Sequence, residues 1–315
     1  MRRLHQMMLP ILVAATFVAG CAAPEDSGTA EDANATGLVD TTVAQALRHR
    51  AEGGDPEAQF TLGNMYYFGE GVPEDHGEAA GWYRQAAEQG YGDAQFNLGN
   101  MYYYGQGLPQ DYRAAEEWYR RAAVRGIAEA QFNLGDMYYY GQGLPQDYRA
   151  AEEWYRHAAG YGHQVAQFNL GNMYHSGEGM PQDYSEAVRW WRRAAEQGYA
   201  SAQFNLGSAY YNGWGVPENY NEAARWWRQA AEQGYENAQF NLGIAYDNGW
   251  GVPEDLVYAH KWLNLAGSLG QAQAQAQAQE KRRDVERKMT RDQVAEAQRL
   301  AREWMREFEG RTEGQ

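Results

Sequence analysis

The chain has 315 residues and a formal net charge of −15 at pH 7. An acidic surface repels the phosphates of nucleic acids, and no basic stripe offsets it, so the composition argues against nucleic-acid binding. The single cysteine, Cys21, rules out a disulfide within one chain and a thiolate metal cluster.

The first 20 residues have the features of a secretory signal peptide. Two arginines precede an apolar stretch, Leu9–Gly20, which is too short to span a bilayer but suits a signal-peptide core. The segment Val18–Cys21 resembles the lipobox of bacterial lipoproteins, in which the cysteine is lipidated and becomes the first residue of the mature chain. The resemblance implies a lipid anchor at Cys21. The alternative is ordinary cleavage nearby, which would leave a free thiol.

The residues after Cys21 indicate where the anchored chain resides. Residues 21–40 are small, polar and acidic, which predicts a flexible tether. In Gram-negative lipoproteins an aspartate directly after the cysteine favours retention in the inner membrane, and this chain has Ala22 there. The resemblance therefore implies a protein of the bacterial cell envelope, lipid-anchored in the outer membrane and facing the periplasm.

A repeat of constant length dominates the rest of the chain. Ala-Gln-Phe recurs six times at intervals of 36 residues, beginning at Ala58, Ala94, Ala130, Ala166, Ala202 and Ala238. So uniform a period predicts similar units stacked in a line. Each unit has the pattern of two helices, which in the second unit are expected at about 93–104 and 112–124. Gly99 falls inside the first helix and predicts close approach of its partner helix.

A glycine-rich loop, GQGLPQD in the second unit, joins the two expected helices. A phosphate-binding loop would follow a strand and begin a helix, whereas this loop follows the end of a helix. Gly105 is predicted to end the first helix in a left-handed conformation, and Asp111 to cap the second. The loop therefore indicates a connection between helices and not a nucleotide site.

The repeat resembles a known family. The pattern A-x-F-x-L-G-x-x-Y-x-x-G-x-G-x-P-x-D-Y-x-x-A-x-x-W-Y-x-x-A-A-x-x-G is similar to the Sel-1-like repeat (SLR), which is related to the tetratricopeptide repeat. The resemblance covers about residues 51–270. It implies an all-α fold, an α/α solenoid forming a right-handed superhelix with a concave groove, and a role in protein–protein contact. Bacterial members of the family are similar to envelope adaptors.

The ends of the repeat region are expected to carry capping helices. Residues 41–54 have the pattern of the second helix of a lost half-repeat, followed by six repeats over residues 55–270. Residues 271–315 are predicted to be a helical cap, because Gln and Ala favour helix and the pair Thr290 and Gln293 has the spacing of a capping box.

The first helix of each unit carries a second face rich in Tyr and Asn. In solenoids of this type the first helix lines the concave surface, so we expect these side chains to form a groove. Such a mixture suits protein recognition, and it also suits stacking on sugar rings. The alternative is that this face packs between neighbouring helices, above all at its Phe positions. The candidate groove residues are Asn64, Tyr67, Asn97, Asn100, Tyr103, Asn133, Asp136, Tyr139, Asn172, His175, Ser208 and Tyr211.

Two loops carry a tryptophan where the others carry Glu or Gln. Trp214 and Trp250 each lie between two glycines, where local burial is difficult. They are candidate interface anchors, because Trp is enriched at binding hot spots. The alternative is packing across neighbouring loops.

No constellation of catalytic residues stands out. His157, His163 and His175 lack a repeated ligand spacing, and the serines lack a nucleophile motif. We expect no catalytic, metal or cofactor site. The sequence favours a non-enzymatic protein-binding scaffold or adaptor of the envelope, with an unidentified protein partner. The alternative is a glycan-associated protein that binds exopolysaccharide or peptidoglycan.

Overall fold

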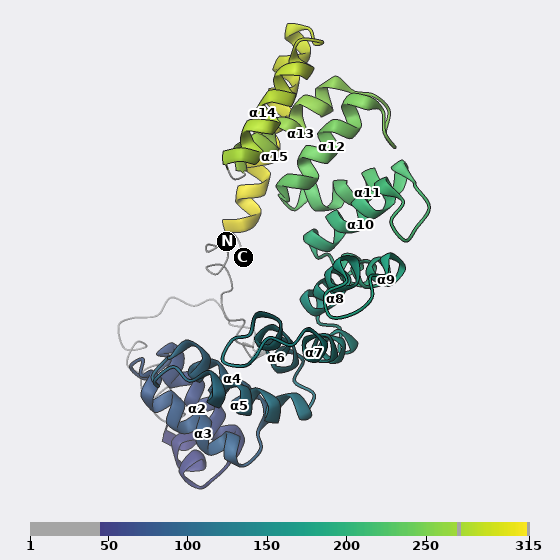
Figure 1. The fold of residues 1–315 in the computed structure, drawn as a ribbon. Helices are drawn as coiled ribbons and strands as arrows, with labels where there is room; N and C mark the ends of the chain where they lie inside the picture. The colour runs from purple at the N-terminus through teal and green to yellow at the C-terminus, as the bar shows by residue number, and fades with distance from the viewer. Residues whose placement is uncertain (1–44, 270–271, 314–315) are drawn as a thin grey trace, which may run out of the picture. The chain divides into compact units, whose positions relative to one another are not determined.

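The computed structural model describes residues 45–269 and 272–313, and every regular element in these ranges is a helix (Figure 1). The predicted signal peptide, the anchor at Cys21 and the tether lie outside the described residues. No helix of the described part is both long and apolar enough to cross a membrane.

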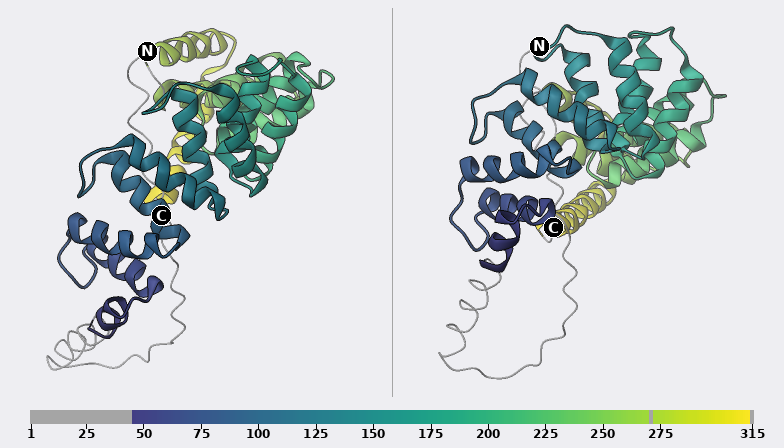
Figure 2. Two further views of the ribbon diagram at one scale, coloured as in Figure 1. Left: turned by 60° about the horizontal axis from the view of Figure 1, so that its bottom comes forward. Right: turned by 90° about the horizontal axis from the view of Figure 1, so that it is seen from below.

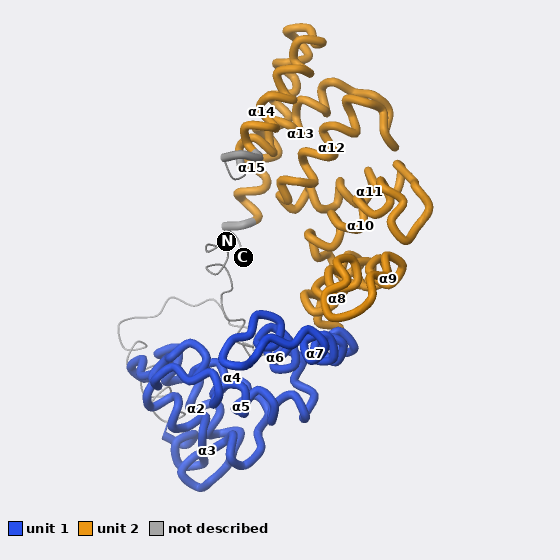
Figure 3. Tube along the Cα trace, viewed as in Figure 1, with its two compact units in different colours: residues 1–161 blue, residues 162–315 orange. Residues whose placement is uncertain are grey.

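The helices form antiparallel pairs, one pair to each repeat, which can be followed in Figures 1 and 2. This organisation confirms the predicted all-α fold of six repeats. A division between Tyr161 and Gly162 separates two compact units of three repeats each, coloured in Figure 3. Unit 1 contains α2 (Pro56–Phe68), α3 (His76–Glu88), α4 (Gly92–Tyr104), α5 (Tyr112–Val124), α6 (Ala128–Tyr140) and α7 (Tyr148–Gly160). Unit 2 contains α8 (Gln164–Ser176), α9 (Tyr184–Glu196), α10 (Ala200–Asn212), α11 (Tyr220–Glu232), α12 (Glu236–Asn248), α13 (Leu256–Leu269), α14 (Ala272–Glu286) and α15 (Arg291–Glu313).

The helix ends in the second repeat follow the predicted loop chemistry. Gly105 ends α4 with a φ of 69°, in the left-handed region that glycine tolerates best. Asp111 caps α5, because its carboxylate accepts hydrogen bonds from the backbone N–H groups of Arg113 at 2.9 Å and Ala114 at 3.1 Å. Both predictions for this loop are confirmed.

A large side chain from each second helix, aromatic in the first five repeats and Leu263 in the sixth, fills the space beside a glycine of the first helix. Tyr119 of α5 is 1% exposed, and a Cβ added to Gly99 would lie only 2.6 Å from its ring. The equivalent aromatic is Tyr in the three repeats of unit 1 and Trp in the next two, as Trp191 and Trp227. The glycine therefore lets a large ring occupy the interface between the two helices, as the sequence predicted.

Helices cover both ends of the repeat region. At the start, residues 45–52 are helical, and Ala51 packs in a buried cluster with Ala58 and Leu62. At the other end, α15 packs along α13, where the Trp262 and Trp304 rings lie 6.2 Å apart. The capping box at the start of α15 is confirmed, because the Thr290 N–H donates to the Gln293 side chain at 2.9 Å and the Gln293 N–H donates to the Thr290 hydroxyl at 3.3 Å.

Candidate functional site

The Asn positions of the candidate groove have a structural role. In the second repeat the Tyr119 hydroxyl donates to Asn100 Oδ1 at 2.7 Å, and the Asn133 amide of the following repeat donates to the same oxygen at 3.3 Å. In unit 2 the Trp191 indole N–H and the Asn205 amide donate to Asn172 Oδ1, at 3.1 and 3.0 Å. The side-chain oxygen at this position therefore accepts two hydrogen bonds. One comes from the buried aromatic residue of the same repeat, and the other comes from an Asn on the first helix of the next repeat.

Most of the candidate groove residues are only partly accessible. Asn97 and Asn100 are 6% and 4% exposed, so the expectation that they line an open groove does not fit their burial. The reason is packing, because the amide of Asn100 meets the buried Tyr119 hydroxyl. The other ten are half-buried on the first helices: Asn64, Tyr67, Tyr103, Asn133, Asp136, Tyr139, Asn172, His175, Ser208 and Tyr211.

Two of the candidate tyrosines in unit 1 join their repeat to the next one. The Tyr67 hydroxyl donates to the side-chain oxygen of Gln106 at 2.9 Å, and the Tyr103 hydroxyl makes the same bond to Gln142. Each glutamine belongs to the loop of the following repeat. The loop residue at this position therefore contacts the first helix of the preceding repeat, which the sequence pattern did not reveal.

The loop tryptophans of unit 2 occupy the same position as these glutamines. The Trp214 ring lies 5.0 Å from the His175 ring and 6.2 Å from the Tyr184 ring, measured between centroids. Trp250 lies 5.5 Å from Tyr211 in the equivalent place one repeat later. Both tryptophans therefore pack against aromatic side chains at the helix ends of the preceding repeat. Both rings are nevertheless half-buried, so part of each remains open to solvent.

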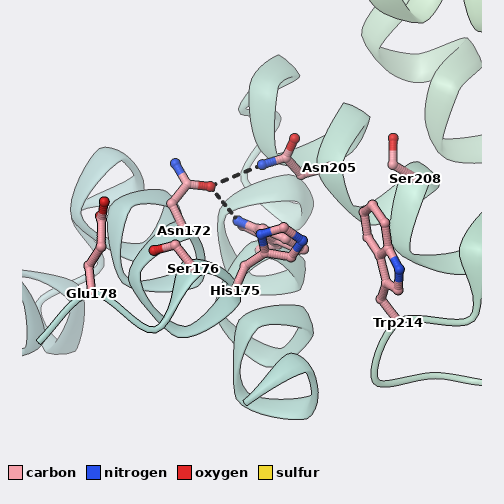
Figure 4. A pocket seen from close by; sticks show the side chains of 8 residues that line it. Asn172, His175, Ser176, Glu178, Asn205, Ser208 and Trp214 are labelled. Atoms are coloured by element: carbon pink, nitrogen blue, oxygen red, sulfur yellow. Dashed lines mark hydrogen bonds between the residues drawn. The ribbon is translucent and has the colours of Figure 1, made fainter. Parts of the chain in front are cut away.

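A hollow of about 250 Å³ lies beside Trp214, between α8 and α10 of unit 2 (Figure 4). In Figure 4 the Asn172 oxygen takes both of its hydrogen bonds at the inner wall, while Glu178 and Trp214 lie on opposite sides. The hollow thus combines aromatic faces with uncharged polar groups and one carboxylate, that of Glu178. Its lining residues are Asn172, His175, Ser176, Glu178, Trp191, Asn205, Ser208 and Trp214.

His175 is the titratable group packed most closely in this hollow. Its ring lies 5.3 Å from both Tyr184 and Trp191, and its Nε2 atom has no hydrogen-bond partner among the described residues. Burial lowers the pKa of His175, because removing water from the ring penalises its charged form. The imidazole is therefore neutral at pH 7 and presents a polar but uncharged surface.

An equivalent hollow of about 240 Å³ lies one repeat further along, between α10 and α12. Trp250 takes the place of Trp214, Tyr211 that of His175, and Trp227 that of Trp191. The sequence analysis did not predict the residues that form the inner walls of the hollows, which are Trp191 with Asn205 in the first and Trp227 with Asn241 in the second. The sequence feature that could have indicated them is the replacement of Tyr by Trp at one position of the second helix.

Unit 1 differs from unit 2 at the end of its first helices. Phe68, Tyr104 and Tyr140 occupy equivalent positions in three successive repeats, and their side chains are 46%, 43% and 55% exposed. The matching positions in unit 2 hold Ser176, Asn212 and Asn248. The first three repeats therefore present aromatic rings to solvent where the last three present small polar groups.

The described residues contain no group of three or more His, Cys, Asp or Glu side chains placed to hold a metal ion. Among the three histidines considered from the sequence, His175 lies in the first hollow and His163 caps α8 by accepting from the Ala166 N–H at 3.2 Å. His157 lies in the last turn of α7 beside Trp154.

These features define an all-α repeat protein built from stacked helix pairs. The chain belongs to the Sel1 repeat family, whose model matches residues 56–91, 92–126, 128–160, 164–199, 200–235 and 237–271. No curated protein sequence matches the chain at a significant level.

Two solved structures are similar to the chain over most of its length. One is a protective antigen present in uropathogenic Escherichia coli strains, which displays an SLR fold. It is 36% identical, with a TM-score of 0.74 over 85% of this chain. The chain spans 57% of that protein's length. The other is a Sel1 repeat protein from Oxalobacter formigenes, 33% identical, with a TM-score of 0.61 over 74% of this chain and 95% of that one.

Proposed function

We propose that the protein is a non-enzymatic scaffold that binds a segment of a partner protein along the first helices of unit 2. The observation that carries this proposal is the pair of equivalent hollows in successive repeats, each bordered by a half-buried loop tryptophan. A partly exposed Trp beside a hollow provides a large apolar contact, and such residues dominate many protein interfaces.

The lining of the hollows supports a peptide as the bound segment. Asn172, Asn205 and Ser176 offer hydrogen-bonding groups at the first hollow, and neutral His175 adds another without adding charge. A main chain presents a carbonyl at every residue and an N–H at every residue except proline, so a series of polar groups flanked by aromatic rings matches an extended peptide. Repetition of the hollow one repeat further along would contact a second part of the same segment.

The location in the cell is part of the proposal. The signal-peptide features and the lipobox-like segment ending at Cys21 support a lipid-anchored protein, held by residues 21–40 at the outer membrane and facing the periplasm. An anchored scaffold in this compartment would meet partner proteins of the envelope.

Site-specific photo-crosslinking in living cells tests the binding surface. A photoreactive amino acid is placed at Ser176 or at Asn212, which are exposed residues lining the two hollows. The control position is Arg189, which is exposed on the second helix α9. The proposal predicts that both hollow positions capture the same envelope protein and that Arg189 does not. Capture of glycan at Ser176, or equal capture at all three positions, would contradict it.

A further inference from the structure

The second hollow lacks an acceptor that the first four repeats possess. At Asn100 and at Asn172, one side-chain oxygen accepts from a buried ring of its own repeat and from an Asn of the next repeat. The equivalent position in the fifth repeat is Ser208. Its hydroxyl donates to the Phe204 carbonyl at 3.0 Å, and its oxygen lies one bond closer to the main chain than the Oδ1 atom of Asn.

The buried Trp227 ring is left without a hydrogen-bond partner. Trp227 is only 4% exposed, and its Nε1 atom has no partner among the described residues. In the preceding repeat the equivalent Trp191 N–H reaches Asn172 at 3.1 Å. A buried N–H without an acceptor costs free energy, so this donor is a strong point of attraction for any oxygen that can reach it.

Trp227 lines the hollow of about 240 Å³, but its Nε1 atom is covered, so an oxygen from the hollow reaches it only when the neighbouring side chains shift. Asn241, the equivalent of the Asn205 that donates to Asn172, lines the same hollow. The Tyr211 ring lies 5.4 Å from Trp227 and 5.5 Å from Trp250, so aromatic faces flank these two donors. At about 30 Å³ for each water in the liquid, the space corresponds to roughly eight waters, enough for one amino-acid side chain.

The charge of the lining selects among possible acceptors. No residue that lines this hollow is charged, and the chain as a whole carries a net charge of −15. A carboxylate would lose its water without gaining a cation, which is unfavourable. An uncharged carbonyl loses less on desolvation, and it can accept from two N–H groups at once through its two lone pairs.

We propose that the hollow bounded by Trp227, Asn241 and Trp250 is a subsite for an uncharged carbonyl group of a bound peptide, namely the side-chain amide of Asn or Gln or a main-chain carbonyl. The carbonyl oxygen takes the place that the Asn172 oxygen occupies one repeat earlier. This inference rests on the proposed peptide-binding function and specifies which chemical group the fifth repeat recognises.

The test follows the indole N–H signals of the full-length chain by ¹⁵N–¹H NMR. N-acetylglutamine methylamide is titrated as the neutral amide probe, with acetate as the charged probe and glucose as the sugar probe. The Trp227 signal is identified as the one that moves in the unliganded Ser208→Asn variant. The amide probe is expected to move the Trp227 signal downfield and saturably, whereas the Trp191 signal, whose N–H already has a partner, serves as the control.

The Ser208→Asn variant also tests the mechanism, because it supplies the acceptor that repeats one, two and four possess. It is expected to weaken binding of the amide probe at least tenfold, while Ser208→Ala binds it as the unmodified chain does. The proposal is overturned if Trp227 responds no more than Trp191, if Ser208→Asn binds the probe normally, or if acetate or the sugar binds at a tenfold lower concentration. These outcomes are separate from the cellular crosslinking, because they need no natural partner.

Discussion

The ring of Tyr119 lies directly against Gly99, so that a Cβ at that glycine would come within 2.6 Å of Tyr119 Cδ1. Changing Gly99 to Ala should therefore destabilise the protein, although Ala is the better helix former by about 1 kcal/mol. Forcing an extra methyl into a packed interface costs about 1–3 kcal/mol. We expect urea unfolding, followed by circular dichroism, to show a net loss of up to about 2 kcal/mol.

Gly81 provides a matched control for this experiment. It lies inside helix α3, and a Cβ added there meets no atom within 4 Å. The Gly81→Ala change should stabilise unit 1 by about 0.5–1 kcal/mol, because it restricts the unfolded chain without creating a clash. If both glycine variants changed stability in the same direction, the packing role assigned to Gly99 would be incorrect.

Asp136 is expected to make the stability of unit 1 depend on pH. Burial raises the pKa of Asp136 to about 6, and the hydrogen bond from Tyr155 at 2.6 Å only partly opposes this. The folded state therefore binds the proton more tightly than the unfolded state, whose pKa lies near the usual 3.8. Between these two values, raising the pH lowers the free energy of unfolding.

Replacing Asp136 with Asn, the residue found at this position in three other repeats, should remove that effect. From the shift in pKa, at about 1.4 kcal/mol for each unit, the variant should gain stability on the order of 3 kcal/mol at pH 7.5. Most of this gain should disappear at pH 4.5, where the wild-type carboxyl is protonated in the folded state. Urea unfolding of both chains at the two pH values measures the difference, and an equal gain at both would refute the assignment.

The reciprocal change gives an independent check. Asn100 occupies the equivalent position in the second repeat and accepts from Tyr119 in the same way. Asn100→Asp should place a new carboxyl in this buried setting, so it should destabilise the protein at pH 7.5 and be tolerated better at pH 4.5. A variant with no pH dependence would show that burial does not govern the pKa at this position.

Ser208→Asn should stabilise unit 2 in the absence of any ligand. The new side chain would offer the Trp227 N–H the acceptor that Trp191 already has in Asn172. Satisfying a buried donor contributes about 1–3 kcal/mol. Thermal unfolding should show a higher midpoint for Ser208→Asn than for Ser208→Leu, which fills similar space without an acceptor, and equal midpoints would argue against the missing hydrogen bond.

The local rules of the repeat could be predicted from the sequence because they depend on neighbours along the chain. The end of helix α4 at Gly105 and the cap at Asp111 follow from backbone conformation and nearby N–H groups. The close approach at Gly99 follows from the cost of a glycine inside a helix. These relationships recur because each repeat has the same residues at the same spacing.

The accessibility of the groove could not be predicted in the same way. A helical projection places Asn100 on the face away from Leu98, but its exposure depends on a hydroxyl nineteen residues later, which uses its oxygen. Trp214 likewise contacts His175 of the preceding repeat, a partner that no local rule identifies. The division between Tyr161 and Gly162 was also not apparent from a period that is constant throughout.

The contribution of the loop tryptophans to binding tests the proposed function most directly. Affinity for the envelope protein captured at Ser176 is measured by calorimetry for the wild type, for Trp214→Ala and for Trp250→Ala. Tyr258→Ala, which removes a 40% exposed ring from the second helix α13, is the control. The account predicts that each Trp variant, still folded by circular dichroism, binds at least tenfold more weakly, whereas the control binds normally. Unchanged affinity in both folded Trp variants would contradict binding at these hollows.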